Sequence, residues 1–215
     1  MDLVIYGAGG FGKEIACLIN HQMSDDFRNK YNFIGFIDDG KPPGTPIKYG
    51  DILGDVSFIN EYKGALAVVF SIAQPKILHS AIKKITNKNI DYPNLISPGV
   101  LFYDPASVVM GKGNVLINGC RISCDVNIGN FNLFNGFVAI GHDVTIGDCN
   151  SFGPSSRISG DVKIGNNNFL GLNSAVLQGL KIGNEIRLGA GSILMKDADL
   201  KDVLYFGNPA RKVID

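Results

Sequence analysis

The second half of the chain contains a single histidine, His142, followed directly by an aspartate, Asp143. A neutral imidazole is a competent general base at pH 7, and an adjacent carboxylate can fix its tautomer or raise its basicity. Eighteen residues before and after His142 lie Cys124 and Gly160. If the chain repeats at that interval, Gly160 leaves a slot beside the imidazole. The alternative interpretation is an exposed turn histidine within a stacked row of turn aspartates.

A second candidate site is the glycine-rich segment Gly7–Gly12, which stands between an apolar stretch and an amphipathic one. Glycines allow a phosphate to approach the backbone closely at a helix N-terminus. Asp38 and Asp39 end the next apolar stretch, where ligands of open α/β sheets bind, although Asp-Asp-Gly is also a common turn. Residues 1–97 are too short for a full dinucleotide fold, so a mononucleotide or its sugar diphosphate fits better than NAD.

These segments lie in an expected N-terminal α/β domain, residues 1–97. Alternating apolar and amphipathic stretches predict a small Rossmann-like parallel sheet. We expect strands over 3–6, 33–37, 65–70 and 95–96, and helices over 13–22 and 75–86, the latter with proline in its first turn.

From about residue 98 the sequence has a fixed period. Every sixth position from 110 to 188 is apolar, fourteen of fourteen, and every third hexad begins with an apolar residue and glycine. The unit is therefore eighteen residues, and Asn114, Asn132, Asn150 and Asn168 recur at the same interval. This period predicts a β-solenoid of about five coils over residues 98–215. The glycine excess is expected at corners that need unusual backbone angles.

Composition excludes several classes of protein. Lys+Arg and Asp+Glu are 20 each, with a pI near 6.8, so neither nucleic acid nor a membrane surface is an expected partner. No apolar run is long enough to span a membrane and the first residues do not resemble a signal peptide, so we expect a cytoplasmic protein. The four cysteines form no CxxC pair, and free thiols are expected.

Together these motifs resemble the two-domain branch of the hexapeptide-repeat sugar acyltransferases, which includes nucleotide-amino-sugar N-acetyltransferases and sialic acid O-acetyltransferases. The segments that carry the resemblance are Tyr6–Gly12, Phe36–Asp39, Gly141–Gly147 and Gly207–Ala210. It implies a left-handed parallel β-helix, a homotrimer with active sites at the subunit interfaces, and acetyl-CoA as co-substrate without a metal.

The resemblance also implies roles for individual residues. His142 would be the general base and Asp143 its support. Contacts to the nucleotide sugar are expected from Gly9, Gly10, Phe11, Asp38, Asp39, Ala73 and Asn135, and contacts to CoA from Ser151, Gly160 and Leu172. Two positions depart from the pattern: Ser151 stands where some members have a second histidine, and Ala73 where glycine is usual.

The leading hypothesis is acetyl transfer from acetyl-CoA to the amine of a nucleotide-linked sugar, such as a 4-amino-4,6-dideoxyhexose used for surface polysaccharide. O-acetylation of sialic acid or a related sugar is the near alternative, because an amine and a hydroxyl need the same base. A nicotinamide-dependent oxidoreductase, a zinc-dependent solenoid such as a carbonic anhydrase, and a non-catalytic solenoid are the distant ones.

Overall fold

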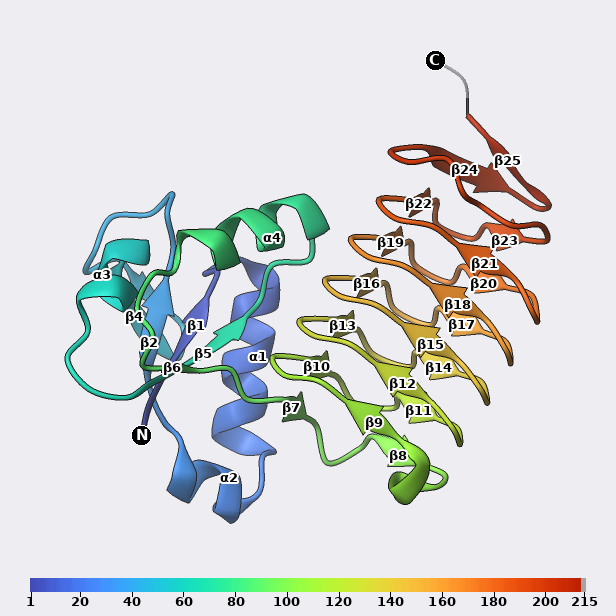
Figure 1. Ribbon diagram of the computed structural model, residues 1–215. Helices are drawn as coiled ribbons and strands as arrows, with labels where there is room; N and C mark the ends of the chain where they lie inside the picture. Colours follow the sequence, from blue (N-terminus) through green and yellow to red (C-terminus); the bar gives the residue numbers. More distant parts are fainter. Residues whose placement is uncertain (214–215) are drawn as a thin grey trace. The chain divides into compact units, whose positions relative to one another are not determined.

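The computed structural model describes residues 1–213 and divides into two compact units, Met1–Pro98 and a second that begins at Gly99 (Figure 1). The first combines helices with a six-stranded sheet, and the second is built from short parallel strands stacked in coils. None of the helices in residues 1–213 is long and apolar enough to cross a membrane.

The sheet of the N-terminal unit has the strand order β3-β4-β2-β1-β5-β6. Its central strand, β1, is parallel to both neighbours, and Leu3, Val4 and Ile5 on it are fully buried. Such continuous burial is typical of a parallel sheet covered on both faces. The strands are β1 (Asp2–Tyr6), β2 (Asn32–Ile37), β3 (Pro46–Ile47), β4 (Gly50–Gly54), β5 (Leu66–Phe70) and β6 (Ile90–Asp91).

Four helices accompany this sheet: α1 (Gly10–His21), α2 (Asp25–Lys30), α3 (Val56–Glu61) and α4 (Pro75–Lys84). Helix α1 begins three residues before the predicted start at Lys13, so part of the glycine segment is helical. Gly12 is in that first turn, where a Cβ would be 3.1 Å from the carbonyl carbon of Gly7 and closer still to its oxygen. The helix therefore packs against the end of β1 at a distance that only glycine permits.

Other predictions for this unit need correction. Leu95–Ile96 is a strand, β7, but it is not part of the N-terminal sheet, whose edge is formed by β6. Helices α2 and α3 and strands β3, β4 and β6 were not predicted. Each has at most six residues, which is too short to establish a periodicity.

The second unit is a parallel β-helix, as predicted. Strands at an eighteen-residue interval pair in register, so that Arg121 pairs with Ala139 and Ala139 with Arg157. One sheet runs β8-β11-β14-β17-β20-β23, and its strands are β8 (Leu101–Phe102), β11 (Arg121–Ile122), β14 (Ala139–Ile140), β17 (Arg157–Ile158), β20 (Ala175–Val176) and β23 (Ile193–Leu194).

Two further sheets complete the coils. The second is formed by β9 (Val109–Met110), β12 (Asn127–Ile128), β15 (Thr145–Ile146), β18 (Lys163–Ile164) and β21 (Lys181–Ile182). The third contains β10 (Val115–Leu116), β13 (Leu133–Phe134), β16 (Ser151–Phe152), β19 (Phe169–Leu170), β22 (Arg187–Leu188), β24 (Leu204–Gly207) and β25 (Ala210–Lys212). A short 3₁₀ turn, Pro105–Ser107, interrupts the first coil.

Glycine serves two purposes at the corners, and one of them was predicted: Gly113, Gly119, Gly179 and Gly191 have left-handed φ angles between 66° and 80°. Most left-handed corner positions hold other residues, including Asp125, Asp143 and Asp161 with φ between 54° and 59°. Gly141, in contrast, has an ordinary φ, and a Cβ there would lie 2.6 Å from the backbone nitrogen of Gly160 in the next coil. Close approach of successive coils, more than backbone angle, accounts for glycine at that corner position.

The interior combines stacked apolar side chains with a ladder of buried asparagines. Phe134 and Phe152 stack at 4.8 Å between ring centroids. Asn150 Nδ2 donates to Asn132 Oδ1 (3.0 Å) and to the Gly165 carbonyl (2.9 Å), and Asn150 Oδ1 accepts from Asn168. Each amide thus satisfies backbone and side-chain groups of the adjacent coils, as buried polar groups require.

Candidate active site

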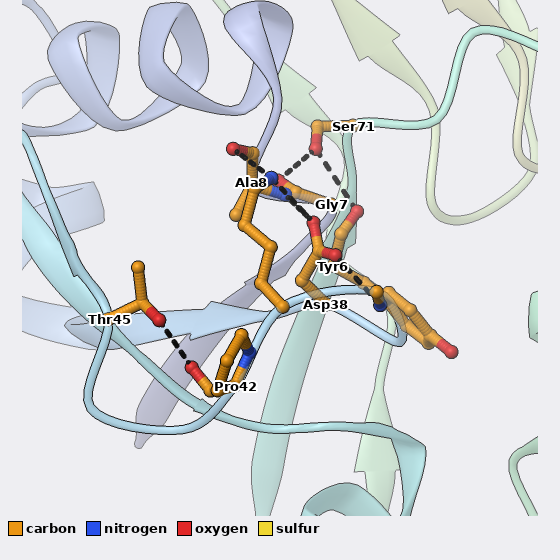
Figure 2. Close-up of polar contacts among 9 residues, drawn as sticks. Tyr6, Gly7, Ala8, Asp38, Pro42, Thr45 and Ser71 are labelled. Carbon is orange, nitrogen blue, oxygen red and sulfur yellow. Dashed lines mark hydrogen bonds and ion pairs between the residues drawn. The ribbon is translucent and has the colours of Figure 1, made fainter.

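The carboxylate of Asp38 holds the glycine loop in place. Its Oδ2 accepts from the backbone N–H of Ala8 (2.8 Å) and its Oδ1 from Gly40 (3.0 Å), while Lys41 Nζ lies 3.2 Å from Oδ2. Figure 2 shows the hydrogen bond between Asp38 and Ala8, and beside it the one in which the Ser71 hydroxyl donates to the Gly7 carbonyl (2.7 Å). Burial raises the pKa of Asp38, but these hydrogen bonds and the lysine outweigh it, so the pKa is lowered overall.

Asp39 joins three elements. The Tyr6 hydroxyl at the end of β1 donates to Asp39 Oδ1 (2.7 Å), and Lys84 Nζ, in the last turn of α4, lies 2.7 Å from Oδ2. Burial raises the pKa of Asp39, and the contacts from Lys84 and Tyr6 lower it below its usual value. Burial and the same contact raise the pKa of Tyr6, so the pair is a phenol donating to a carboxylate.

These groups border a hollow of about 420 Å³ at the carboxyl ends of β1, β2 and β5. Its volume is within the usual range for small-molecule sites. Apolar and cationic side chains both contribute to its wall. The lining residues are Tyr6, Gly7, Asp38, Asp39, Gly40, Ile72, Lys76, Ile77, Ser80, Ala81 and Lys84.

Of the residues expected to bind the nucleotide sugar, Asp38 and Asp39 line this hollow, and Gly9, Gly10, Phe11 and Ala73 do not. Gly9 is the N-cap of α1, and Gly9, Gly10 and Ala73 are exposed. A Cβ at Gly9 or Gly10 would have no atom of residues 1–213 within 4 Å, so packing does not require glycine there.

Lys76, Ile77 and Lys84 were not predicted as site residues. Their amphipathic helix was predicted over 75–86, but its periodicity does not show which groups face the strand ends. Tyr6 was also missed as a site residue, although it opens the motif that carries the resemblance.

His142 lies at the corner that follows β14. Its Nδ1 is 2.7 Å from Asp143 Oδ2, and the two side chains are 51% and 57% exposed. A carboxylate only accepts, so in the neutral ring Nδ1 carries the hydrogen and Nε2 keeps the lone pair. Asp143 adopts φ 59°, a conformation that aspartate tolerates better than most residues.

Gly160 lies against the Nε2 side of the imidazole. A Cβ at this position would be 2.5 Å from His142 Cε1 and closer still to Nε2. The backbones of the two coils are also hydrogen-bonded here, because the Asp161 N–H donates to the His142 carbonyl at 2.8 Å. The predicted slot beside the imidazole is therefore filled by the imidazole itself, and any side chain at 160 would displace the ring.

A second hollow, of about 360 Å³, lies beside His142 on the sheet that contains β14. Strands β11, β14 and β17 form its floor. Its lining residues are Tyr103, Arg121, Ser123, Ala139, Ile140, Gly141, His142, Arg157 and Ile158.

Three predicted residues are on other parts of the β-helix. Asn135 and Leu172 follow β13 and β19, on the edge before the sheet of β14, whereas His142 is on the edge after it. Asn135 Oδ1 accepts from the N–H of Gly136 (2.7 Å), and Leu172 is 55% exposed. Ser151 is buried on β16. One chain therefore does not bring these three residues together with His142.

The described residues contain no cluster that could form a metal centre. Within residues 1–213 no three His, Cys, Asp or Glu side chains gather in a way that could hold an ion. The cysteines described are free thiols, and burial raises the pKa of Cys120 and of Cys149 to about 11.

One family model matches most of the first unit. Residues 2–85 match the model of the PglD N-terminal domain. A sequence comparison with curated proteins found no match.

Solved structures share the fold over the whole chain. A perosamine N-acetyltransferase variant from Caulobacter crescentus, with a histidine replaced by asparagine and with CoA and GDP-perosamine bound, is 23% identical, with a TM-score of 0.86 over 100% of this chain and 98% of that one. The acetyltransferase domain of PglB from Neisseria gonorrhoeae, with acetyl coenzyme A, is 21% identical (TM-score 0.86, covering 99% and 98%). WeeI from Acinetobacter baumannii is 26% identical (TM-score 0.87, covering 99% and 100%). The fold inferred from the repeats is confirmed.

Proposed function

We propose that this chain, which matches the PglD N-terminal domain over residues 2–85 and shares its fold with solved sugar acetyltransferases, transfers an acetyl group from acetyl-CoA to the amine of a nucleotide-linked amino sugar. The observation that carries this proposal is the arrangement at the β14 corner. His142 has its Nδ1 engaged by Asp143 and its ring packed on Gly160.

The chemistry follows from the tautomer. Nε2 of His142 takes a proton from the acceptor amine as the amine nitrogen bonds to the acetyl carbon of the thioester. The carbon–sulfur bond then breaks, and the proton passes to the departing thiolate, so that amide and free CoA are the products. Asp143 keeps the proton on Nδ1 before the reaction and stabilises the imidazolium during it. General base catalysis of this kind contributes roughly 10²- to 10⁴-fold.

The hollow of the N-terminal unit suits the nucleotide of the acceptor. Ile72, Ile77 and Ala81 offer apolar surface to a base, and Lys76 and Lys84 provide positive charge for phosphates. The exposed glycines at the start of α1 leave backbone N–H groups accessible to a phosphate as well. Asp38 acts in this scheme through the loop that it holds, because its oxygens already accept from Ala8 and Gly40.

The proposal includes a homotrimer. Asn135 and Leu172 are on a different edge of the β-helix from His142, so a site that uses all three needs a second chain. Both edges carry exposed apolar side chains: Phe137 (68%) and Leu172 (55%) on one, and Leu177 (44%) and Met195 (42%) on the other. Exposed apolar surface of this kind is typical of subunit interfaces.

The test is acetyl transfer by the purified protein. It is incubated with acetyl-CoA and a panel of 4-amino sugars linked to UDP, dTDP or GDP, with sialic acid and its CMP form as hydroxyl acceptors, and free thiol is followed. We expect turnover with one amino sugar and a loss of at least 10²-fold in kcat for His142→Ala.

The control is His21→Gln, an exposed histidine at the far end of α1, which should keep full activity. Turnover only with sialic acid would replace N-acetylation by O-acetylation. Absence of thiol release with every acceptor would refute acetyl transfer to these sugars.

A further inference from the structure

Two arginines border the hollow beside His142. Arg121 on β11 and Arg157 on β17 both pair in register with Ala139 on β14, one from each side. Neighbouring strands are about 4.8 Å apart, so the two arginine backbones are separated by about 9–10 Å across the sheet. The alanine methyl between them leaves the space above β14 open, and each arginine side chain is long enough to reach it.

This pair carries uncompensated charge. No acidic side chain lines the hollow, and within residues 1–213 no carboxylate lies within ion-pair distance of either guanidinium. Arg157 Nη1 donates to two neutral acceptors, Asn173 Oδ1 at 3.1 Å and the Ser155 carbonyl at 3.4 Å. At the hollow of the N-terminal unit, in contrast, Lys84 forms an ion pair with Asp39.

The groups that surround the arginines are hydroxyls and the imidazole. Tyr103 and Ser123 line the same hollow, as does His142. Each planar guanidinium group can form two parallel hydrogen bonds to a phosphate or carboxylate, and the neighbouring hydroxyls can donate further ones. The hollow therefore combines a binding site for an oxyanion with the group that would remove the acceptor's proton.

We propose that Arg121 and Arg157 bind an oxyanion of the acetyl acceptor and so hold its amine or hydroxyl at His142. This inference rests on the proposed acetyl transfer and adds a specificity site to it. The oxyanion is either the diphosphate of a nucleotide-linked sugar, one sugar ring away from a 4-amino group, or the carboxylate of an acidic sugar. An acceptor without a negative charge at that position is expected to be poor.

Steady-state kinetics of R121Q and R157Q test the assignment. With acetyl-CoA saturating, the acceptor KM of each variant should rise about 10- to 100-fold, because a charge-assisted hydrogen bond is lost, while kcat stays within about twofold. R121K keeps the charge without the planar fork and should lie between R121Q and the unaltered protein. Arg187→Gln, an exposed arginine on β22 in another sheet, is the matched control and should leave both constants unchanged.

Two kinetic results would overturn the inference. An increase in the KM of acetyl-CoA with the acceptor KM unchanged would assign the arginines to the phosphates of the coenzyme. Unchanged constants for both substrates would leave the arginines without a role in binding.

Direct binding separates this inference from the proposed function and identifies the anion. Calorimetric titration of pyrophosphate and of sialic acid compares the unaltered protein with the R121Q/R157Q double variant, with the oligomeric mass checked for both. Binding of one of these probes that the double variant loses supports the inference even if no acceptor is acetylated, and shows whether phosphate or carboxylate is the group recognised. Because the N-terminal hollow can also bind phosphate, pyrophosphate binding is compared as the number of sites per chain. Turnover with an unchanged number of pyrophosphate sites and unchanged sialic acid binding in the double variant would refute the inference alone.

Discussion

The two units assemble their candidate sites in different ways. In the N-terminal unit, Asp39 contacts Tyr6 and Lys84, which are 33 and 45 residues away in the sequence. In the β-helix, His142 contacts the next residue, Asp143, and the residue one coil later, Gly160. A periodic fold converts sequence spacing directly into distance, whereas an α/β fold gathers its site by the packing of separate elements.

The difference extends to how buried polar groups are satisfied. The β-helix repeats one interaction, in which each asparagine bonds to its equivalents in the adjacent coils. The N-terminal unit uses single contacts, such as that of Asp38 with Ala8. A substitution in the β-helix therefore affects several coils, and one in the N-terminal unit affects mainly its own loop. Four predictions test this contrast.

Asn150→Ala should have the largest effect on stability. It leaves the Gly165 carbonyl and the backbone and side-chain N–H groups of Asn168 without their buried partner, at about 1–3 kcal/mol for each unsatisfied group. Asn132 Oδ1 loses one donor but still accepts from the backbone N–H of residue 150. We expect the free energy of unfolding to fall by about 4 kcal/mol, measured by guanidinium denaturation followed by circular dichroism, since the chain has no tryptophan.

The matched control is Asn166→Ala, because Asn166 forms the same kind of ladder contact with Asn184 at an exposed position. Water can replace that contact, so the expected loss is below about 1 kcal/mol. Equal losses for the two variants would show that burial in the ladder has no special importance.

Gly160→Ala tests whether the residue one coil after His142 positions the imidazole. The added methyl would overlap the imidazole, so the ring has to turn away from its place on Asp143. We expect kcat to fall about 100-fold, or about 2.7 kcal/mol in the activation barrier, with little change in the unfolding midpoint. Gly183→Ala, where a Cβ would have its nearest neighbour at 3.4 Å, is the control. Full activity in Gly160→Ala would contradict the assigned role of the imidazole.

Asp143→Asn removes the charge beside His142 and keeps a side chain that tolerates the left-handed backbone at this position. The amide no longer enforces hydrogen on Nδ1, so a smaller fraction of the rings has a free Nε2. We expect kcat to fall about 10-fold, or about 1.4 kcal/mol, with the KM values unchanged, in steady-state assays. A change in KM alone would instead make Asp143 a binding residue.

Asp38→Asn should have the smallest effect and should depend on pH. The folded-state pKa of Asp38 is lowered, so its contribution to stability is present above the unfolded pKa of about 3.9 and is lost as the pH falls through the folded value. We expect the variant to be about 1 kcal/mol less stable at pH 7, with the difference shrinking below about pH 4.

Urea denaturation across this pH range measures the difference for Asp38→Asn. Asp26→Asn, at an exposed position in the first turn of α2, serves as the control and should show no such trend. A difference that grows toward low pH would mean that Asp38 is not stabilised as a carboxylate in the folded protein.

The sequence predicted the β-helix in detail because its signal repeats. The fourteen apolar positions and the recurring asparagines specify which side chains point inward and which residues are vertical neighbours. The adjacency of His142 and Gly160 followed from the same interval. Spacing did not show that the imidazole itself fills the space above Gly160, because that depends on its side-chain torsion angles.

In the N-terminal unit the sequence determined the buried strands, the glycine loop and the acidic strand end. The tertiary structure decided that Asp38 binds the loop backbone, that Asp39 joins Tyr6 to Lys84, and that α4 contributes to the hollow. These contacts connect elements far apart in the chain, and no local pattern encodes which face of a helix meets which strand end. A repeated interval carries long-range geometry in the sequence itself, whereas a single non-local contact exists only once the elements have packed.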